Sequence, residues 1–157
     1  MSTRYLEMIS LIERLHRHFL DVVKLELDHA QIRDINNVQA LMLFNIDDDK
    51  MTVSEITTRG CYLGANASYN LRRLVENGYL AQKRSLHDRR STLVWLNAKG
   101  CALRDRMSEM HRWHVSMLPQ AMIVESDLES TALTLRRIER LWVRAADLVE
   151  RSSLFAA

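Results

Sequence analysis

The stretch of sequence that decides the fold reads Leu71-Arg72-Arg73-Leu74-Val75-Glu76-Asn77-Gly78-Tyr79-Leu80, followed closely by Lys83-Arg84-Ser85-Leu86-His87-Asp88-Arg89-Arg90. The first part predicts a basic helix that ends at Gly78, since glycine is common just past the end of a helix. The second part predicts a short strand and a charged hairpin with a pair of arginines near its turn. A helix that runs directly into such a hairpin presents two adjacent positive elements, which is the arrangement of a winged helix-turn-helix.

Positive charge is concentrated in this stretch. Residues 70–90 hold six Arg or Lys against two acids, an excess of +4, whereas the whole chain has a net charge of only +2. The remainder of the chain is therefore net acidic. A local basic patch is the electrostatic footprint of a protein that binds nucleic acid, so DNA binding is the leading interpretation.

Composition limits the other possibilities. The chain has 157 residues, 47% of them hydrophobic, with only 4 Gly and 1 Pro, which predicts one compact and mostly helical domain. Its two cysteines, Cys61 and Cys101, fit no zinc-ligand spacing, so we expect no metal site. We expect a cytoplasmic protein with no membrane partner, because neither a signal peptide nor a membrane-spanning stretch is present. The absence of catalytic and phosphate-loop motifs argues against an enzyme and against a cofactor.

Hydrophobic periodicity divides the chain into helices and strands. The predicted helices cover residues 5–28, 37–46, 53–60, 65–77, 98–118 and 126–150, and the predicted strands cover 79–84 and 92–96. Asn37, Thr52 and Asn97 are the expected helix caps, and Glu55 completes a capping box with Thr52. The predicted fold class is therefore mainly α with a small β-hairpin wing (α+β), in a single domain of residues 1–157.

Three helices flank the predicted winged lobe of residues 37–97. These helices, at 5–28, 98–118 and 126–150, are strongly apolar on one side. A single small lobe cannot bury all three apolar faces, so we expect them to build a two-fold homodimer. The alternative is that they pack only on their own chain.

The stretch from Asn70 to Gly100 resembles the MarR family of winged-helix regulators. The residues that carry the resemblance are Leu71, Leu74-Val75, Gly78-Tyr79-Leu80, Arg84-Ser85, Asp88-Arg89-Arg90, Val94, Leu96 and Lys99-Gly100. Within that family, residues 60–70 look like the subgroup of the PetP and LdtR regulators. The resemblance implies a homodimer that represses or activates promoters and that is often released by small phenolic or other lipophilic ligands. It also implies that Arg90 enters DNA from the wing, with Asp88 as its brace.

One face of the helix at 65–77 is polar. Asn66, Tyr69, Asn70 and Arg73 recur at spacings of three and four, so they share that face. Asparagine offers a bidentate match to adenine and arginine to guanine, while tyrosine can touch a thymine methyl group. Ser68 and Arg72 flank this face, where phosphate contacts are expected. An ordinary solvated helix face is the alternative, and the basic hairpin that follows favours DNA.

The hairpin supplies the second group of candidate DNA contacts. An arginine at its tip can enter a narrow and electronegative minor groove. The alternative is a solvated hairpin with surface ion pairs of little energetic value. The candidate residues on the hairpin are Lys83, Arg84, His87, Asp88, Arg89 and Arg90.

A regulatory site is predicted between the winged lobe and the flanking helices, because a dimer that spaces two DNA-reading helices is sensitive to small lobe movements. The candidate effector-lining residues are His16, Phe19, Val23, Met42, Tyr62 and Trp113. Cys61, next to the DNA-reading helix, is a candidate redox sensor if its thiolate is stabilised there, and a buried structural thiol is the alternative.

The function predicted from these patterns is a homodimeric DNA-binding transcriptional regulator on pseudo-palindromic operators, released by a small-molecule effector. Two alternatives remain open at this stage. One is a winged-helix module that binds protein, for which an apolar patch on the DNA-reading face would argue. The other is a regulator that senses redox state through Cys61.

Overall fold

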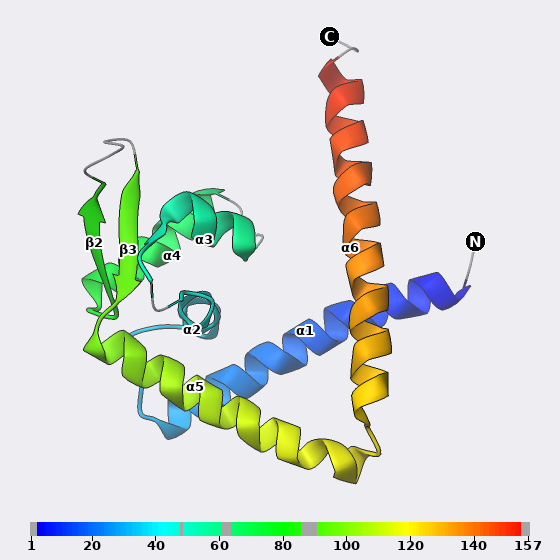
Figure 1. Ribbon diagram of the computed structural model, residues 1–157, viewed down its shortest axis with the longest axis horizontal. Coiled ribbons are helices and arrows are strands. Elements are labelled where there is room, and N and C mark those ends of the chain that lie inside the picture. Colours follow the sequence, from blue (N-terminus) through cyan, green and yellow to red (C-terminus); the bar gives the residue numbers. More distant parts are fainter. Residues whose placement is uncertain (1–2, 48, 61–63, 86–90, 155–157) are drawn as a thin grey trace. The chain divides into compact units, whose positions relative to one another are not determined.

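The structure is a computed structural model that describes residues 3–47, 49–60, 64–85 and 91–154. The chain divides into two compact units, Met1–His111 and Arg112–Ala157, and each is described by itself. The elements, labelled in Figure 1, are α1 (Thr3–His29), α2 (Asn37–Phe44), β1 (Met51–Thr52), α3 (Val53–Arg59), α4 (Gly64–Glu76), β2 (Leu80–Arg84), β3 (Thr92–Leu96), α5 (Ala98–Met117), a 3₁₀ turn (Leu118–Ala121) and α6 (Glu125–Leu154). The prediction of a mainly helical chain with a small antiparallel sheet is confirmed.

Capping boxes start two helices of the first unit, α2 and α3. The capping box of α3 is confirmed, since the Thr52 side chain accepts from the Glu55 amide and the Glu55 side chain accepts in return from the Thr52 amide. A second capping box starts α2, with Asn36 as the cap and Gln39 as its partner. The prediction that Asn37 caps α2 is therefore wrong by one residue. The Asn37 side chain instead donates to the Leu20 carbonyl of α1 at 3.0 Å.

The sheet has three strands in the order β1-β3-β2, all antiparallel. Strands β2 and β3 form the predicted hairpin, with Leu80 opposite Leu96. Strand β1 was not predicted, because two residues carry no periodicity. Met51 of β1 pairs with Val94 of β3, and both are buried. This short strand attaches the start of α3 to the hairpin, so the wing and the helices of the first unit share one framework.

The core lies entirely in the first unit. It contains buried hydrophobic residues from each of its helices and strands. The largest wholly buried side chains are Tyr79, Met42, Leu43, Ile46, Ile56, Leu74, Met107, Val23 and Val94. Each such burial contributes roughly 1.5–3 kcal/mol of hydrophobic free energy relative to exposure. This core holds α4 in place against α2, α3 and the sheet.

Two glycines shape the junction of the sheet and α5. Gly78 adopts a left-handed φ of +73° directly after α4, where another residue would be strained. Gly100 lies against the backbone of Tyr79, and a Cβ atom at Gly100 would come within 2.2 Å of the Tyr79 carbonyl oxygen. Both positions therefore require glycine, the first for its conformation and the second for the close approach.

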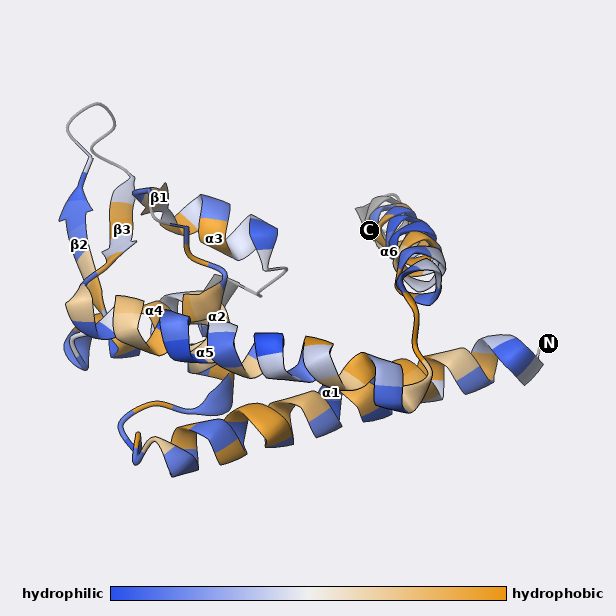
Figure 2. Cartoon of the chain, turned by 60° about the horizontal axis from the view of Figure 1, so that its bottom comes forward, coloured by the Kyte–Doolittle hydropathy of each residue, from blue (hydrophilic) through white to orange (hydrophobic). Residues whose placement is uncertain are grey.

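The second unit differs from the first in the exposure of its side chains. It consists of the end of α5, the 3₁₀ turn and α6, and its side chains from Arg112 to Val149 are all at least partly exposed. Helix α6, seen nearly end-on in Figure 2, carries both hydrophobic and hydrophilic residues. Its exposed large apolar residues are Leu128, Leu133, Leu135, Leu141, Trp142, Val143, Leu148 and Val149. No helix in the described ranges combines the length and hydrophobicity needed to cross a membrane.

Candidate nucleic-acid interface

Helix α4 buries one side and exposes the other. Ala67, Leu71 and Leu74 are at most 4% exposed and face the core. On the other side the structure leaves five of the predicted DNA contacts exposed, namely Asn66, Ser68, Tyr69, Arg72 and Arg73. The exposed side is polar and basic, apart from the ring of Tyr69, which is 59% exposed. Donors, acceptors and one aromatic ring are thus presented together on a helix that the core holds rigidly.

Asn70 lies at the boundary between these two sides and is half-buried. Its side-chain oxygen Oδ1 accepts a hydrogen bond from Nε2 of Gln39 at 3.1 Å. Gln39, on α2, is only 5% exposed and is the one buried polar residue found within the described ranges. Sequence reasoning missed Gln39, although a single amide in the apolar run Val38-Gln39-Ala40-Leu41 is a signal that could have identified it.

Arginine 73 forms an ion pair along its own helix. Its Nη1 atom lies 2.9 Å from Oε2 of Glu76, with the two side chains 44% and 48% exposed. Exposed pairs of this kind contribute little to stability, typically less than about 1 kcal/mol. The Arg73 guanidinium can therefore exchange Glu76 for a phosphate or a base at small cost.

The wing extends from the sheet next to α4. Lys83 and Arg84 are exposed at the end of β2, where they pair with Leu93 and Thr92 of β3. The amide of Ser85 donates to the carbonyl of Ser91 at 2.9 Å, so the two chain segments are still paired beyond the strands. The predicted tip contacts His87, Asp88, Arg89 and Arg90 lie outside the described residues. At the base of the wing, the Lys50 ammonium lies 4.8 Å from the centre of the Trp95 ring, a contact that the sequence did not predict.

A polar network fixes the far end of α4. The Tyr79 hydroxyl donates to Oδ1 of Asp34 at 2.8 Å, and the Lys99 ammonium donates to Oδ2 of Asp34 at 2.6 Å. Lys99 also donates to the carbonyl of Asn77 at 2.9 Å and lies 4.0 Å from the centre of the Tyr79 ring. The network therefore joins the loop after α1, the end of α4 and the start of α5. It carries no predicted DNA contact, and its role is to position α4.

Ionisation of Asp34 is favoured inside this network. Partial burial opposes the charge, but the hydrogen bonds from Lys99 and Tyr79 outweigh that penalty and lower the pKa of the Asp34 carboxyl below its usual value. Burial and the neighbouring Asp34 carboxylate raise the pKa of Tyr79 well above its ordinary value, so the phenol stays protonated and remains a donor. The network is thus held in a single protonation pattern near neutral pH.

An aromatic cavity of about 590 Å³ lies in the first unit. It is lined by His16, Phe19, Leu20, Val38, Leu41, Phe44, Asn45, Gly60 and His111. The His111 ring lies 4.9 Å from the Phe44 ring and 5.8 Å from the Phe19 ring, measured between centroids. The size fits a small organic molecule, since ligand pockets span roughly 300–1,000 Å³.

The predicted effector-lining residues divide into three groups. His16 and Phe19 line this cavity. Val23 and Met42 are 0% exposed and belong to the hydrophobic core, where they pack against neighbours and do not line the cavity. Trp113 lies in the second unit and is 61% exposed, and Tyr62 lies outside the described residues, as does the predicted redox residue Cys61.

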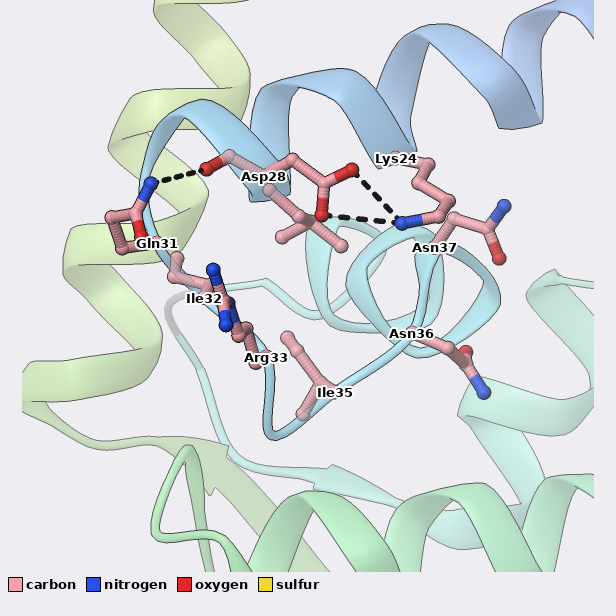
Figure 3. Close-up of a pocket in the computed structure, with 9 residues that line it drawn as sticks. Lys24, Asp28, Gln31, Ile32, Arg33, Ile35, Asn36 and Asn37 are labelled. Carbon is pink, nitrogen blue, oxygen red and sulfur yellow. Dashed lines mark hydrogen bonds and ion pairs between the residues drawn. The ribbon is translucent and has the colours of Figure 1, made fainter.

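A second hollow of about 620 Å³ lies at the end of α1 (Figure 3). Three of its polar lining residues, Lys24, Asp28 and Gln31, are already engaged with one another. The Lys24 ammonium lies 2.9 Å from Oδ2 of Asp28, and Nε2 of Gln31 donates to the Asp28 carbonyl at 3.1 Å. Because Lys24 and Asp28 neutralise each other, the hollow offers less charge to a ligand than its composition suggests. Within the described ranges, no cluster of three His, Cys, Asp or Glu residues could hold a metal ion.

Comparison with known proteins identifies the class of protein that has this arrangement of helices and wing. A family model described as a winged helix DNA-binding domain matches residues 35–100, from the start of α2 to the start of α5. The exopolysaccharide II synthesis transcriptional activator ExpG of Rhizobium meliloti (strain 1021) is 31% identical over 142 residues, which cover 90% of this chain and 73% of ExpG. The chain belongs with ExpG to the winged-helix transcriptional regulators. It is a transcriptional regulator with a winged helix DNA-binding domain.

Solved structures of MarR-type regulators share the fold over nearly the whole chain. FabT of Streptococcus pneumoniae, solved in complex with DNA, superposes with a TM-score of 0.71 at 16% identity, covering 89% of this chain and 98% of FabT. MarR of Staphylococcus aureus, solved in complex with salicylate and kanamycin, superposes with a TM-score of 0.72 at 20% identity, covering 91% of this chain and 95% of that one. At these identities the likeness establishes the fold.

Proposed function

We propose that this regulator binds double-stranded operator DNA with α4 in the major groove and the wing beside it. The observation that carries the proposal is the exposed polar and basic side of α4, set directly opposite its buried side and followed by the basic strand β2. The structures of FabT and of Escherichia coli MarR in complex with DNA support it, because those proteins share this fold. The relative ExpG is named an activator, which favours activation of a promoter over repression.

The regulator acts as a homodimer on a pseudo-palindromic site in this proposal. The support comes from the second unit, whose apolar side chains are exposed in the single chain, and from the exposed residues Leu11 and Leu15 of α1. Surfaces of this kind mark protein–protein contacts. A two-fold dimer would present two copies of α4 to half-sites about one turn of DNA apart.

A small phenolic or lipophilic effector that releases the DNA is the third part of the proposal. Its support is the aromatic cavity around His111, which lies beside α2 within the unit that contains α4. The salicylate complex of S. aureus MarR supports a phenolic ligand. A redox response through Cys61 and a place in the PetP and LdtR subgroup both stay predictions.

A role as a protein-binding module is less well supported. Such a role would favour an apolar DNA-reading face, whereas the exposed side of α4 carries Asn66, Ser68, Arg72 and Arg73. Phosphate binding explains these residue types, and docking of an apolar partner does not.

Selection of genomic DNA fragments by the purified protein, followed by titration in salt, tests the DNA proposal. We expect affinity for the selected fragment to fall about a thousandfold or more from about 50 to 200 mM salt, because a dimer displaces counterions from several phosphates. Arg72→Ala should weaken binding to all sequences and reduce the salt slope by about 2, because a dimer loses one phosphate contact from each subunit. Arg17→Ala is the matched control, since this exposed arginine of α1 pairs with Glu13 and lies outside α4 and the wing. Equal effects of the two variants, or binding that ignores salt, would contradict the proposal.

The effector proposal is tested with salicylate as the probe. Val38 lines the cavity and is 37% exposed, so Val38→Phe should fill the cavity without disturbing the core. We expect salicylate to weaken DNA binding of the parent by roughly 5–150-fold, the usual range of such coupling. Val38→Phe should keep its DNA affinity and lose the response. An equal response in both proteins would place the ligand outside this cavity, and no response in the parent would exclude salicylate-like effectors.

A further inference from the structure

The orientation of the Asn70 side chain is determined by a chain of hydrogen bonds that begins at a backbone amide. The amide of Asn36 donates to Oε1 of Gln39 at 3.1 Å, and Nε2 of Gln39 donates to Oδ1 of Asn70 at 3.1 Å. Gln39 is held further by its own amide, which donates to Oδ1 of Asn36 at 2.8 Å. These contacts lie at the N-terminus of α2, where Gln39 is 5% exposed.

Chemistry allows only one arrangement of these two side-chain amides. A backbone N–H can only donate, so the end of Gln39 that faces Asn36 must be its oxygen. The other end of Gln39 is then its NH₂ group, which also can only donate. The atom of Asn70 that faces it must therefore be the oxygen, since two NH₂ groups cannot bond to each other. The O and N positions of Asn70 thus follow from the fixed direction of a backbone N–H.

Asparagine reads adenine with both ends of its amide, donating to N7 and accepting from the N6 amino group. That mode requires the side-chain oxygen and the NH₂ group to face the base together. In this structure the oxygen of Asn70 is engaged by a buried donor, and breaking that bond would leave the Gln39 NH₂ group without its partner inside the protein. Loss of a buried hydrogen bond of this kind is costly. The end of Asn70 that Gln39 does not engage is the donor Nδ2.

We propose that Gln39 turns the oxygen of Asn70 into the protein, so that Asn70 presents its NH₂ group to DNA and selects a base with an acceptor in the major groove. Guanine, with O6 and N7, thymine, with O4, and adenine, with N7, fit this requirement, whereas cytosine, with only its N4 amino group, does not. The bidentate match to adenine expected from the sequence is thereby replaced. The inference rests on the proposed placement of α4 in the major groove, and Gln39 acts as a positioning residue that never touches DNA.

Two isosteric substitutions at different residues should invert this preference. In Asn70→Asp one carboxylate oxygen accepts from Gln39 and the other is presented to the base as an acceptor. In Gln39→Glu the new carboxylate accepts from the Asn36 amide and from the Asn70 NH₂ group, which turns the oxygen of Asn70 toward the base. Both variants should then favour a base that donates at the same single position of the site, and cytosine, which the parent disfavours, should gain most.

Sequencing of randomised DNA selected by the parent and by each variant measures the effect. We expect the preference at one base position to change by about tenfold toward cytosine, the order of a single hydrogen bond converted to a ratio. Asn66→Asp is the matched control. It adds the same charge to the exposed side of α4 and should weaken binding to all sequences without changing the preferred base at that position.

The outcomes separate this inference from the proposed function. A parent that selects a motif while Asn70→Asp keeps the same base preference overturns the role of Gln39 and leaves DNA binding intact. A parent that enriches no sequence overturns the proposed DNA reading itself. Circular dichroism and thermal melting show whether Gln39→Glu folds, since it adds a buried charge. If it does not fold, Asn70→Asp decides the question alone, because residue 70 is only half-buried.

Discussion

The two units of the chain use their apolar residues in opposite ways. The first unit collects them into a core in which Met42, Leu43, Leu74 and Met107 are all 0% exposed. In the second unit comparable side chains stay exposed, and Leu148 and Val149 are 66% and 70% accessible. Apolar periodicity alone does not distinguish these cases, because both kinds of helix carry stripes at spacings of three and four. The first unit is thus stabilised from within, whereas the exposed apolar surface of the second is the one that we propose to form the dimer.

The largest expected effect comes from breaking the proposed partner surface of the second unit. Leu135 and Trp142 are seven residues apart on α6 and share one side of the helix. The double substitution Leu135→Glu with Trp142→Glu should convert the dimer to a monomer, because four charges would be placed in one two-fold interface. Operator affinity should then fall at least about a hundredfold, since the two half-sites no longer bind as one. Sedimentation at micromolar concentration and DNA titration measure both effects.

The control for this experiment lies on the same helix. Leu133 is 48% exposed and is nine residues from Trp142, a separation that places it on the opposite side of α6. Leu133→Glu should leave the dimer and its DNA affinity unchanged. If the double variant remains dimeric, or if Leu133→Glu dissociates the dimer equally well, then the stripe through Leu135 and Trp142 is not the interface.

The next largest effect is expected on the stability of the first unit, when a side chain is removed from its buried core. Leu74 of α4 is 0% exposed, so Leu74→Ala should lower the free energy of unfolding by about 2–5 kcal/mol. Leu25→Ala is the matched control, since Leu25 of α1 is 58% exposed. That variant should change the free energy of unfolding by less than about 0.5 kcal/mol. Urea unfolding of both proteins provides the comparison, and similar losses would show that the core is not where the stability of the first unit resides.

The helices and the hairpin could be predicted from the sequence because each has enough residues to show a period. The capping box of Thr52 and Glu55 could also be predicted, since it depends on two residues at a fixed spacing. Strand β1 was missed because two residues have no period. The cap of α2 was misplaced by one residue because Asn36 and Asn37 are both good caps, and only the contacts of Gln39 and Leu20 distinguish them.

The candidate site was less predictable than the fold. Sequence spacing placed Asn70 on the polar side of α4, but only the packing of α2 against α4 shows that Gln39 engages its oxygen. Val23 and Met42 lie on apolar faces as expected, yet periodicity cannot separate a side chain that fills the core from one that lines a cavity. Asp34 gave no signal at all, because its partners Tyr79 and Lys99 lie 45 and 65 residues away in sequence.

The smallest effect concerns the polar contacts of the first unit. It tests whether the hydrogen bonds of Asp34 with Tyr79 and Lys99 also stabilise the fold. The pKa of Asp34 is lowered in the folded protein, so its ionised form stabilises the fold. That stability is fully present above the pKa of the unfolded chain, near 3.8, and is lost as the pH falls through the lower folded value. Asp34→Asn should therefore cost about 1 kcal/mol at pH 7, a modest figure because the Asp34 side chain is 43% exposed. The cost should shrink as the pH is lowered below 4, where the parent loses the same contribution.

Asp28→Asn is the matched control for this variant. Asp28 also pairs with a lysine, Lys24 at 2.9 Å, but the pair lies on the surface of α1 and joins no second element. We expect it to change the free energy of unfolding by less than about 0.5 kcal/mol at any pH. Urea unfolding at pH 7 and at about pH 3 measures all three proteins. If Asp34→Asn and Asp28→Asn behave alike, the contacts with Tyr79 and Lys99 contribute no more than a surface ion pair, and α4 is positioned by the hydrophobic core alone.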